Sequence, residues 1–197
     1  MEKLNQLVNN LVEKGWFYQK DFVSQELVKK LQLVCRERSD SGIFHKAAIG
    51  SGQNKTIVEN IRSDKIAWLS EDETNIAVKQ YQSLLNEVKS KINQELFMGL
   101  DGYECHFAIY PEGSFYKAHL DRFKNSSKRA VTFICYLNPD WKTGDGGELK
   151  LHLDEGDIIT EPVGGSVVCF LSDKILHEVL VSKKERMSLT GWFLQRD

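Results

Sequence analysis

The feature that most constrains the fold is a change of hydrophobic period near Gly102. Before this residue, apolar side chains recur every three or four positions, as on one face of a helix. After it, they alternate with polar side chains in short runs separated by turn residues, which is typical of β-strands. About eight strands are expected: Tyr103 to Tyr110, Phe115 to Asp121, Ala130 to Leu137, Glu148 to Leu153, Asp157 to Pro162, Ser166 to Leu171, His177 to Val181 and Arg186 to Leu194. The pattern predicts a sandwich or jelly roll.

The first 100 residues are expected to form three amphipathic helices. Their expected positions are Leu4 to Gly15, Ser24 to the charged stretch that starts at Arg36, and Asn75 to Gly99. We expect one domain over residues 1–197, of α+β class and mainly β. Residues 1–100 would supply helical support and a substrate loop, and residues 101–197 the jelly-roll core.

Composition excludes several classes of protein. A formal net charge of -2 and a pI near 6.2 give no general basic field for nucleic acid or an anionic membrane. The four cysteines form no C-x-x-C pair and lie mostly in apolar runs, which predicts buried, reduced thiols. The N-terminus lacks the apolar run of a signal peptide, and no stretch approaches the ~20 apolar residues of a membrane helix. We therefore expect a cytoplasmic protein with no direct nucleic-acid or membrane partner.

Three residues suggest a metal site. His119 and Asp121 are two apart in an expected strand and so face the same side. His177, between apolar residues, is expected on a strand that returns beside the first. Two histidines and one carboxylate are the ligand set of non-haem Fe(II) oxygenases and leave about three coordination positions open. Zinc with a bound water is the competing metal.

A second H-x-D sequence, His152 and Asp154, must be weighed against the first. It leads into the acidic turn that contains Glu155 and Asp157, which predicts exposure. The pair at His119 and Asp121 is therefore preferred.

Arg186 indicates an anion site. Alternation through the last strand puts Arg186, Ser188, Thr190 and Trp192 on one face. A guanidinium inside a barrel needs an anion, and a carboxylate held bidentately is the simplest one. A metal triad plus a buried arginine suggests a keto-acid co-substrate with one end on the metal and the far carboxylate at Arg186.

The ordered motifs resemble the prolyl-hydroxylase-domain branch of the Fe(II)/2-oxoglutarate dioxygenases, which includes the animal oxygen-sensing prolyl hydroxylases and small bacterial relatives. The matching segments are Ile61 to Trp68, Tyr110-Pro111 with Tyr116 to Asp121, Tyr136 to Trp141, Gly146 to Leu149, and His177 to Val179 through Arg186 to Trp192. The resemblance implies a double-stranded β-helix braced by N-terminal helices. It also implies Fe(II), 2-oxoglutarate and O2, with ascorbate as a supporting reductant.

The resemblance also assigns roles to single residues. The 2-oxoglutarate positions are Arg186, Tyr110, Tyr136, Thr190 and Trp192. The substrate positions are Arg62, Asp64, Arg129 and Trp192. Pocket-lining positions are Ile66, Ala108 and Leu149, and strand alternation adds His106, where the animal enzymes carry an apolar residue; we favour a pocket-wall role for His106 over a fourth iron ligand. A segment from Ile43 to Asn60 matches a substrate-closing loop, although its composition fits an ordinary solvated loop equally well.

The implied reaction is 4-hydroxylation of a prolyl residue in a protein, coupled to conversion of 2-oxoglutarate to succinate and CO2. The carboxylate of Asp121 favours hydroxylation over halogenation. Trp192, where nucleic-acid demethylases carry a second arginine, argues against that branch. The implied protein substrate is elongation factor Tu. Two alternatives stay open: a hydroxylase of a free amino acid or other small molecule, and a non-catalytic module that senses iron and 2-oxoglutarate.

Overall fold

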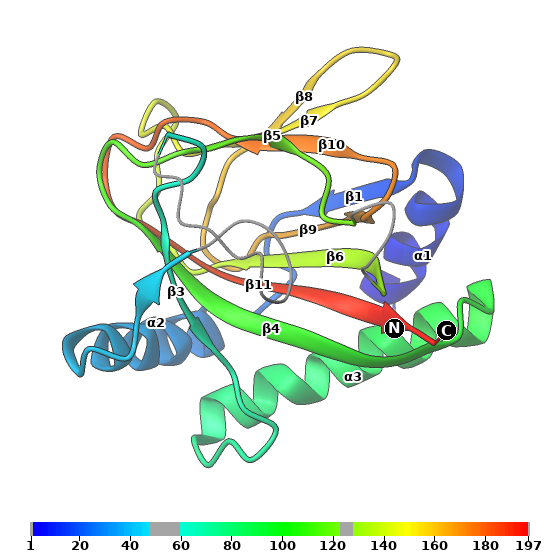
Figure 1. The fold of residues 1–197 in the computed structure, drawn as a ribbon. Helices are drawn as coiled ribbons and strands as arrows, with labels where there is room; N and C mark the ends of the chain where they lie inside the picture. The colour runs from blue at the N-terminus through cyan, green and yellow to red at the C-terminus, as the bar shows by residue number, and fades with distance from the viewer. Residues whose placement is uncertain (1, 48–59, 123–127, 197) are drawn as a thin grey trace.

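Two antiparallel sheets face each other in the fold (Figure 1). The computed structural model describes residues 2–47, 60–122 and 128–196, so most of the expected substrate loop from Ile43 to Asn60 lies outside the described residues. The larger sheet has the strand order β1-β9-β6-β11-β4-β3-β2, and the smaller one has the order β5-β10-β7-β8. This arrangement of strands confirms the jelly-roll prediction.

The strands follow the expected positions closely after Gly102. The large sheet contains β1 (Trp16–Gln19), β2 (His45–Lys46), β3 (Lys65–Trp68), β4 (Leu100–Tyr110), β6 (Arg129–Tyr136), β9 (Val167–Leu171) and β11 (Arg186–Gln195). The small sheet contains β5 (Tyr116–His119), β7 (Leu149–His152), β8 (Ile158–Thr160) and β10 (Leu176–Val179). The first three strands were not expected, because two to four residues are too few to show a period.

The three expected helices are all present. They are α1 (Glu2–Lys14), α2 (Gln25–Asp40) and α3 (Ile76–Leu96). Ser24 and Asn75 cap α2 and α3, with side chains that accept hydrogen bonds from backbone N–H groups of the first turn. The expected end of α2 near Arg36 was wrong, because the helix continues to Asp40: Arg36, Glu37 and Asp40 are exposed to solvent, and Arg38 pairs with Glu73.

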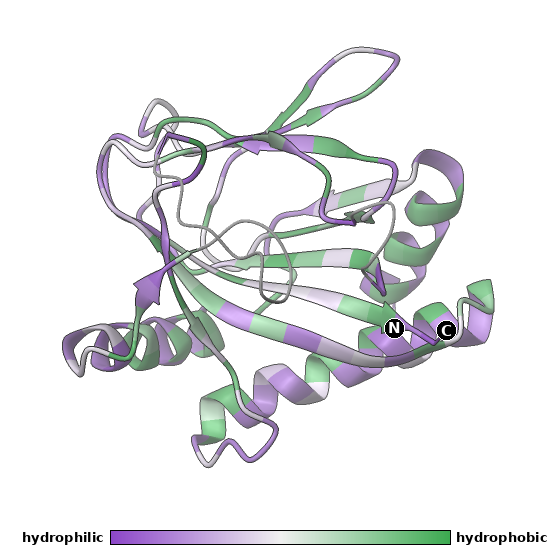
Figure 2. Cartoon of the chain, viewed as in Figure 1, coloured by the Kyte–Doolittle hydropathy of each residue, from purple (hydrophilic) through white to green (hydrophobic). Residues whose placement is uncertain are grey.

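The helices cover one face of the large sheet, as the ribbon shows (Figure 1). Apolar side chains of α1, α2 and α3 pack there against every second residue of the central strands, including Phe107, Phe133 and Leu189. The hydropathy colouring shows the polar residues of α3 alternating with apolar ones (Figure 2). A second cluster, with Ala108, Tyr136 and others, lies between the two sheets. The sheet therefore separates a helix-packed core from an interior that is available for a site.

The remaining expectations concern cysteines and membranes. Cys35, Cys105, Cys135 and Cys169 are all buried and free, as expected, and burial raises the pKa of Cys35 and of Cys135 to about 12. Within the described ranges, no helix combines the length and the apolar character that crossing a membrane requires.

Candidate active site

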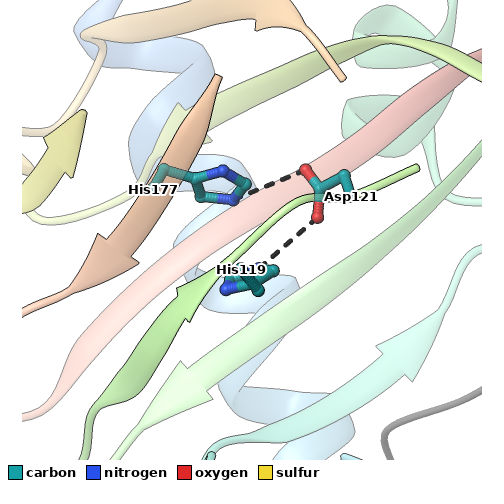
Figure 3. A group of neighbouring side chains, drawn as sticks. All are labelled: His119, Asp121 and His177. Atoms are coloured by element: carbon teal, nitrogen blue, oxygen red, sulfur yellow. Dashed lines mark ion pairs between the residues drawn. The ribbon is translucent and has the colours of Figure 1, made fainter. Parts of the chain in front are cut away.

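Three candidate metal ligands converge between the sheets. His119 is the last residue of β5, Asp121 follows two residues later, and His177 lies in β10 directly opposite His119 in the strand register. Nε2 of His119 lies 3.5 Å from Oδ1 of Asp121, and Nε2 of His177 lies 3.5 Å from Oδ2 (Figure 3). Their ligand atoms all fall within 4.8 Å of one another. An ion between them would meet two imidazole nitrogens and one carboxylate.

Backbone hydrogen bonds fix the tautomer of both histidines. Nδ1 of His119 donates to the carbonyl of Lys117 at 2.8 Å, and Nδ1 of His177 donates to the carbonyl of Ile175 at 3.0 Å. Each proton on Nδ1 leaves the Nε2 lone pair directed at the site. Such outer contacts orient metal ligands and raise their basicity.

The carboxylate is oriented as well. Oγ1 of Thr132 donates to Oδ2 of Asp121 at 2.8 Å. Ser172 lies 2.9 Å from Thr132, and because the one hydroxyl proton of Thr132 is used, Ser172 must be the donor of that pair. The hydroxyls of Ser172 and Thr132 thus form a hydrogen-bonded chain that orients the carboxylate of Asp121.

The protonation states suit a divalent cation. Burial lowers the pKa of His177 to about 4, so its imidazole is neutral at pH 7. Burial would raise the pKa of Asp121, but His177 and His119 outweigh it and hold that pKa well below its usual value. A neutral imidazole and an ionised carboxylate are the forms that bind a metal.

Arg186 forms the other end of the interior. It is 2% exposed, and among the described residues no carboxylate pairs with it and Nε has no hydrogen-bond partner. Its guanidinium lies 4.8 Å from the ring centre of Tyr110 and 5.0 Å from that of Tyr136. A buried charge is stable only when it is paired. The pocket therefore fits a carboxylate-bearing co-substrate such as 2-oxoglutarate.

The backbone around Arg186 is held tightly. The side-chain amide of Asn138 donates to the carbonyls of Pro162 and Met187 and accepts from the amide of Met187, at 2.8, 3.0 and 2.7 Å. Gly147 adopts φ +64, and a Cβ there would lie 3.0 Å from Cδ of Arg186. The positive φ favours glycine at this position, and a Cβ would also lie only 2.8 Å from Oγ of Ser182.

The other predicted 2-oxoglutarate residues line the same face. Along β11, Arg186 is followed on the same face by Ser188, Thr190 and Trp192. The opposite face of the strand carries Met187, Leu189 and Phe193, which pack on the helices. The hydroxyls of Ser188 and Thr190 lie 3.4 Å apart. The predicted lining residues Ile66, Ala108 and Leu149 are buried in the cluster between the sheets.

Aromatic residues gather at the far end of this face. His106 packs edge-on against Trp68, with ring centres 4.9 Å apart, and lies 5.5 Å from Trp192. The guanidinium of Arg129 lies 3.6 Å from the Trp192 ring centre and is bonded to Glu104 at 2.6 Å. Burial lowers the pKa of His106 to about 4. His106 is thus a neutral wall residue, and no described cluster makes it a fourth ligand of the metal.

The second H-x-D sequence is not part of the site. His152 lies 3.1 Å from both Asp157 and Glu178 on the partly exposed side of β7, and Asp154 is exposed. Among the described residues, only His119, Asp121 and His177 are grouped as a metal site.

The site also contains Tyr116, to which the motif analysis gave no role. Its ring stacks on His119, with centres 3.6 Å apart and planes 16° apart. Strand parity placed Tyr116 on the opposite face from His119, so the sequence alone gave no signal for this contact.

Comparisons with known proteins agree with this geometry. The family model of the 2OG-Fe(II) oxygenase superfamily matches residues 105–194. The crystal structure of a Pseudomonas putida prolyl-4-hydroxylase is 40% identical, covers 98% of this chain and 100% of its own, and superposes with a TM-score of 0.90. A prolyl hydroxylase structure with a hypoxia-inducible-factor peptide, from Trichoplax adhaerens, is 28% identical with a TM-score of 0.91, covering 98% and 90%.

Two animal proteins are similar over most of the chain. Egl nine homolog 1 of Rattus norvegicus and of Homo sapiens are each 28% identical over 189 residues, which is 90% of this chain. The chain spans 54% of the rat protein and 43% of the human one.

Fold, metal triad and anion pocket together define an iron-dependent oxygenase that uses a 2-oxo acid. More narrowly, the chain belongs to the prolyl-hydroxylase branch of the 2OG-Fe(II) oxygenase superfamily. Members of this superfamily are dioxygenases that use Fe(II), 2-oxoglutarate and O2.

Proposed function

We propose that this chain is a protein-prolyl 4-hydroxylase that modifies a prolyl residue of a protein, with elongation factor Tu as the first candidate substrate. The observation that carries the proposal is that the same chain holds a metal triad and a buried Arg186 that has no carboxylate partner among the described residues. The triad alone fits several metalloenzymes, whereas the added anion pocket fits a 2-oxo acid.

The residues divide the work as follows. His119, Asp121 and His177 would hold Fe(II), which, with bound 2-oxoglutarate and O2, supplies the oxidising chemistry and yields succinate and CO2. Arg186 would pair with the distal carboxylate, and the buried hydroxyl of Tyr136 would donate to the same anion. Tyr110, Thr190 and Trp192 would complete the co-substrate wall.

Tyr110 and Tyr136 act as donors because both are protonated at neutral pH. Burial raises the pKa of each phenol above its usual value. The interior would also exclude water from the reacting centre, because Leu149 of the small sheet and Val168 and Phe170 of the large sheet are buried between the two sheets.

A protein substrate is supported by two relatives. The Pseudomonas putida structure, 40% identical, is a prolyl-4-hydroxylase, and the Trichoplax adhaerens structure holds a peptide. Arg62, Asp64, Arg129 and Trp192 are proposed to contact or organise the peptide at the mouth. Residues 1–197 are proposed to act as one catalytic domain, with the helices bracing the sheet that carries Arg186.

The test uses the purified protein, reconstituted anaerobically with Fe(II). Oxygen, 2-oxoglutarate and a bacterial lysate are added, and succinate and +16 Da prolyl peptides are followed by mass spectrometry, with His119→Ala as the control. We expect succinate that depends on the lysate and one hydroxylated proline, both absent from the variant. Purified elongation factor Tu replaces the lysate in a second arm.

Two outcomes would contradict the proposal. If iron and 2-oxoglutarate bind but no protein is modified, a hydroxylase of free amino acids takes its place. If modification occurs in the lysate but elongation factor Tu is unchanged, the proposed substrate is wrong while the activity stands.

A further inference from the structure

A bulge in β5 turns Tyr116 toward the metal site. In the strand register His177 pairs with His119 and Val179 pairs with Tyr116, so three steps along β5 match two along β10. Residues three apart on a regular strand face opposite sides, but one extra residue brings them to the same side. The Tyr116 ring can therefore stack on His119.

An arginine supports the Tyr116 ring. The guanidinium of Arg62 lies 4.3 Å from its centre. Arg62 is itself fixed by two hydrogen bonds to Asp64, at 2.7 and 2.5 Å, and Asp64 is 1% exposed. Burial would lower the pKa of Arg62, but the bonds and charge of Asp64 outweigh it and raise that pKa. Arg62 and Asp64 therefore form an ion pair, held by two hydrogen bonds, beside the ring of Tyr116.

Backbone bonds join the same segment to β5. The amide of Lys117 donates to the carbonyl of Ile61 at 2.9 Å, and the amide of Ser63 donates to the carbonyl of Phe115 at 3.2 Å. An isolated β-bridge pairs Arg62 with Tyr116. Residues 61–63 therefore form the edge partner of the strand that carries His119.

His119 is the ligand that most needs such support. Its side chain is 18% exposed, against 4% for His177 and 7% for Asp121. The bond from Nδ1 to Lys117 fixes one atom of the imidazole, but a ring held at one atom can still tilt. A stacked neighbour restrains the tilt of the ring plane.

We propose that Tyr116 and Arg62 are positioning residues that hold the plane of His119 and thereby set the affinity of the iron site. This role differs from the peptide contact proposed for Arg62, and it rests on the iron site of the proposed function. Outer contacts of a metal ligand typically change metal affinity about 10- to 100-fold.

The experiment measures anaerobic Fe(II) binding by calorimetry, without prolyl substrate. Tyr116→Leu and Arg62→Met are each expected to weaken binding about tenfold or more. Tyr116→Phe should bind as the wild type does, because it keeps the ring and the Tyr116 hydroxyl makes no hydrogen bond within the described part of the chain. The double variant should be no weaker than the worse single variant if both act through one stack.

Matched controls separate positioning from general damage. Arg38→Met removes an arginine that is also part-buried, paired with Glu73 at 2.6 Å and placed over Phe107, but on the helix side of the sheet. Tyr103→Leu removes a tyrosine that packs on Phe193. Both should leave Fe(II) affinity unchanged. Thermal melts of the metal-free proteins report whether each variant folds. If Tyr116→Leu does not fold, the Fe(II) affinity of Arg62→Met tests the inference.

The outcomes are distinct. Equal Fe(II) affinity in the wild type, Tyr116→Leu and Arg62→Met would overturn this inference and leave the proposed function standing. A wild type that binds no Fe(II) would overturn the proposed function itself. Loss of affinity in Tyr116→Phe as large as in Tyr116→Leu would also overturn the inference, because the ring would then not be the active part.

Discussion

The two faces of β11 differ in the side chains that they bury. One face presents Met187, Leu189 and Phe193 to the helices, where they are buried among apolar side chains. The other presents Arg186, Ser188 and Trp192 to the interior, where the guanidinium of Arg186 is buried without a carboxylate partner among the described residues. One strand thus gains its stability on one side and keeps this buried charge on the other. The comparison indicates that the stability of the fold and the binding of the co-substrate can be changed separately.

Replacing the charged residue should give the largest effect. We expect Arg186→Met to weaken 2-oxoglutarate binding about 100- to 1,000-fold, since loss of a buried charge-assisted pair costs about 3–4 kcal/mol. The ligand-free protein should be as stable as the wild type or more so, because a buried unpaired charge is removed. Calorimetric titration and urea unfolding measure the two quantities. A destabilised variant with normal binding would refute the assignment.

The next prediction concerns Leu189, on the face of β11 that packs against the helices. Leu189 is fully buried against the helix-packed core. Leu189→Ala should lower the free energy of unfolding by about 2–5 kcal/mol, from lost transfer energy and the cavity left behind. The dissociation constant of 2-oxoglutarate should stay unchanged below the unfolding transition. If affinity fell as far as in Arg186→Met, the two faces would not be independent.

The buried histidines should make the fold sensitive to acid. Burial lowers the pKa of His106 to about 4 in the folded chain, below the ~6.5 of an unfolded histidine, so the unfolded state binds the extra proton first. Stability is therefore fully present above pH ~6.5 and is lost as the pH falls toward 4.

We expect His106→Leu to remove about 2 kcal/mol of the loss between pH 7 and pH 5. Urea unfolding at both pH values measures it. Part of the loss should remain, because burial lowers the pKa of His177 in the same way. An unchanged pH slope would show that the imidazole of His106 is not shielded from water.

We expect a smaller effect from the hydroxyl of Thr132, which donates a hydrogen bond to the metal ligand Asp121. Thr132→Val removes the donor to Asp121 and keeps the shape of the side chain. We expect Fe(II) binding about tenfold weaker, because the carboxylate loses its orienting bond. Ser182→Ala, a change at another fully buried hydroxyl that bonds only to the carbonyl of Lys184, is the control.

How much of the structure the sequence could predict depended on how regular each segment is. Alternation along β4 and β11 placed Tyr110 and Arg186 correctly on the inner face, because both strands are long and regular there. The motif spacing likewise anticipated that His119, Asp121 and His177 would meet. The predicted roles of these residues in binding metal and co-substrate await experiments.

The alternation of side chains along a strand did not predict which side they face where the strands are irregular. The bulge in β5 puts Tyr116 and His119, three residues apart, on the same side of the strand, and a single extra residue leaves no trace in composition. For Arg62 and Asp64 the sequence left two readings open, a contact with the substrate or a surface salt bridge. The structure shows that they pair with each other, and that the pair is largely buried. Short strands such as β1 and β3 form only because longer neighbours offer them an edge.

The three hydrogen bonds of Asn138 have a consequence for the route by which a co-substrate reaches Arg186. They tie the first residues of β11 to the turn before β9 through one side chain. The amide of Met187 should therefore exchange its hydrogen as slowly as the most protected amides of the sheet. We therefore expect a co-substrate to bind and leave without movement of this end of β11.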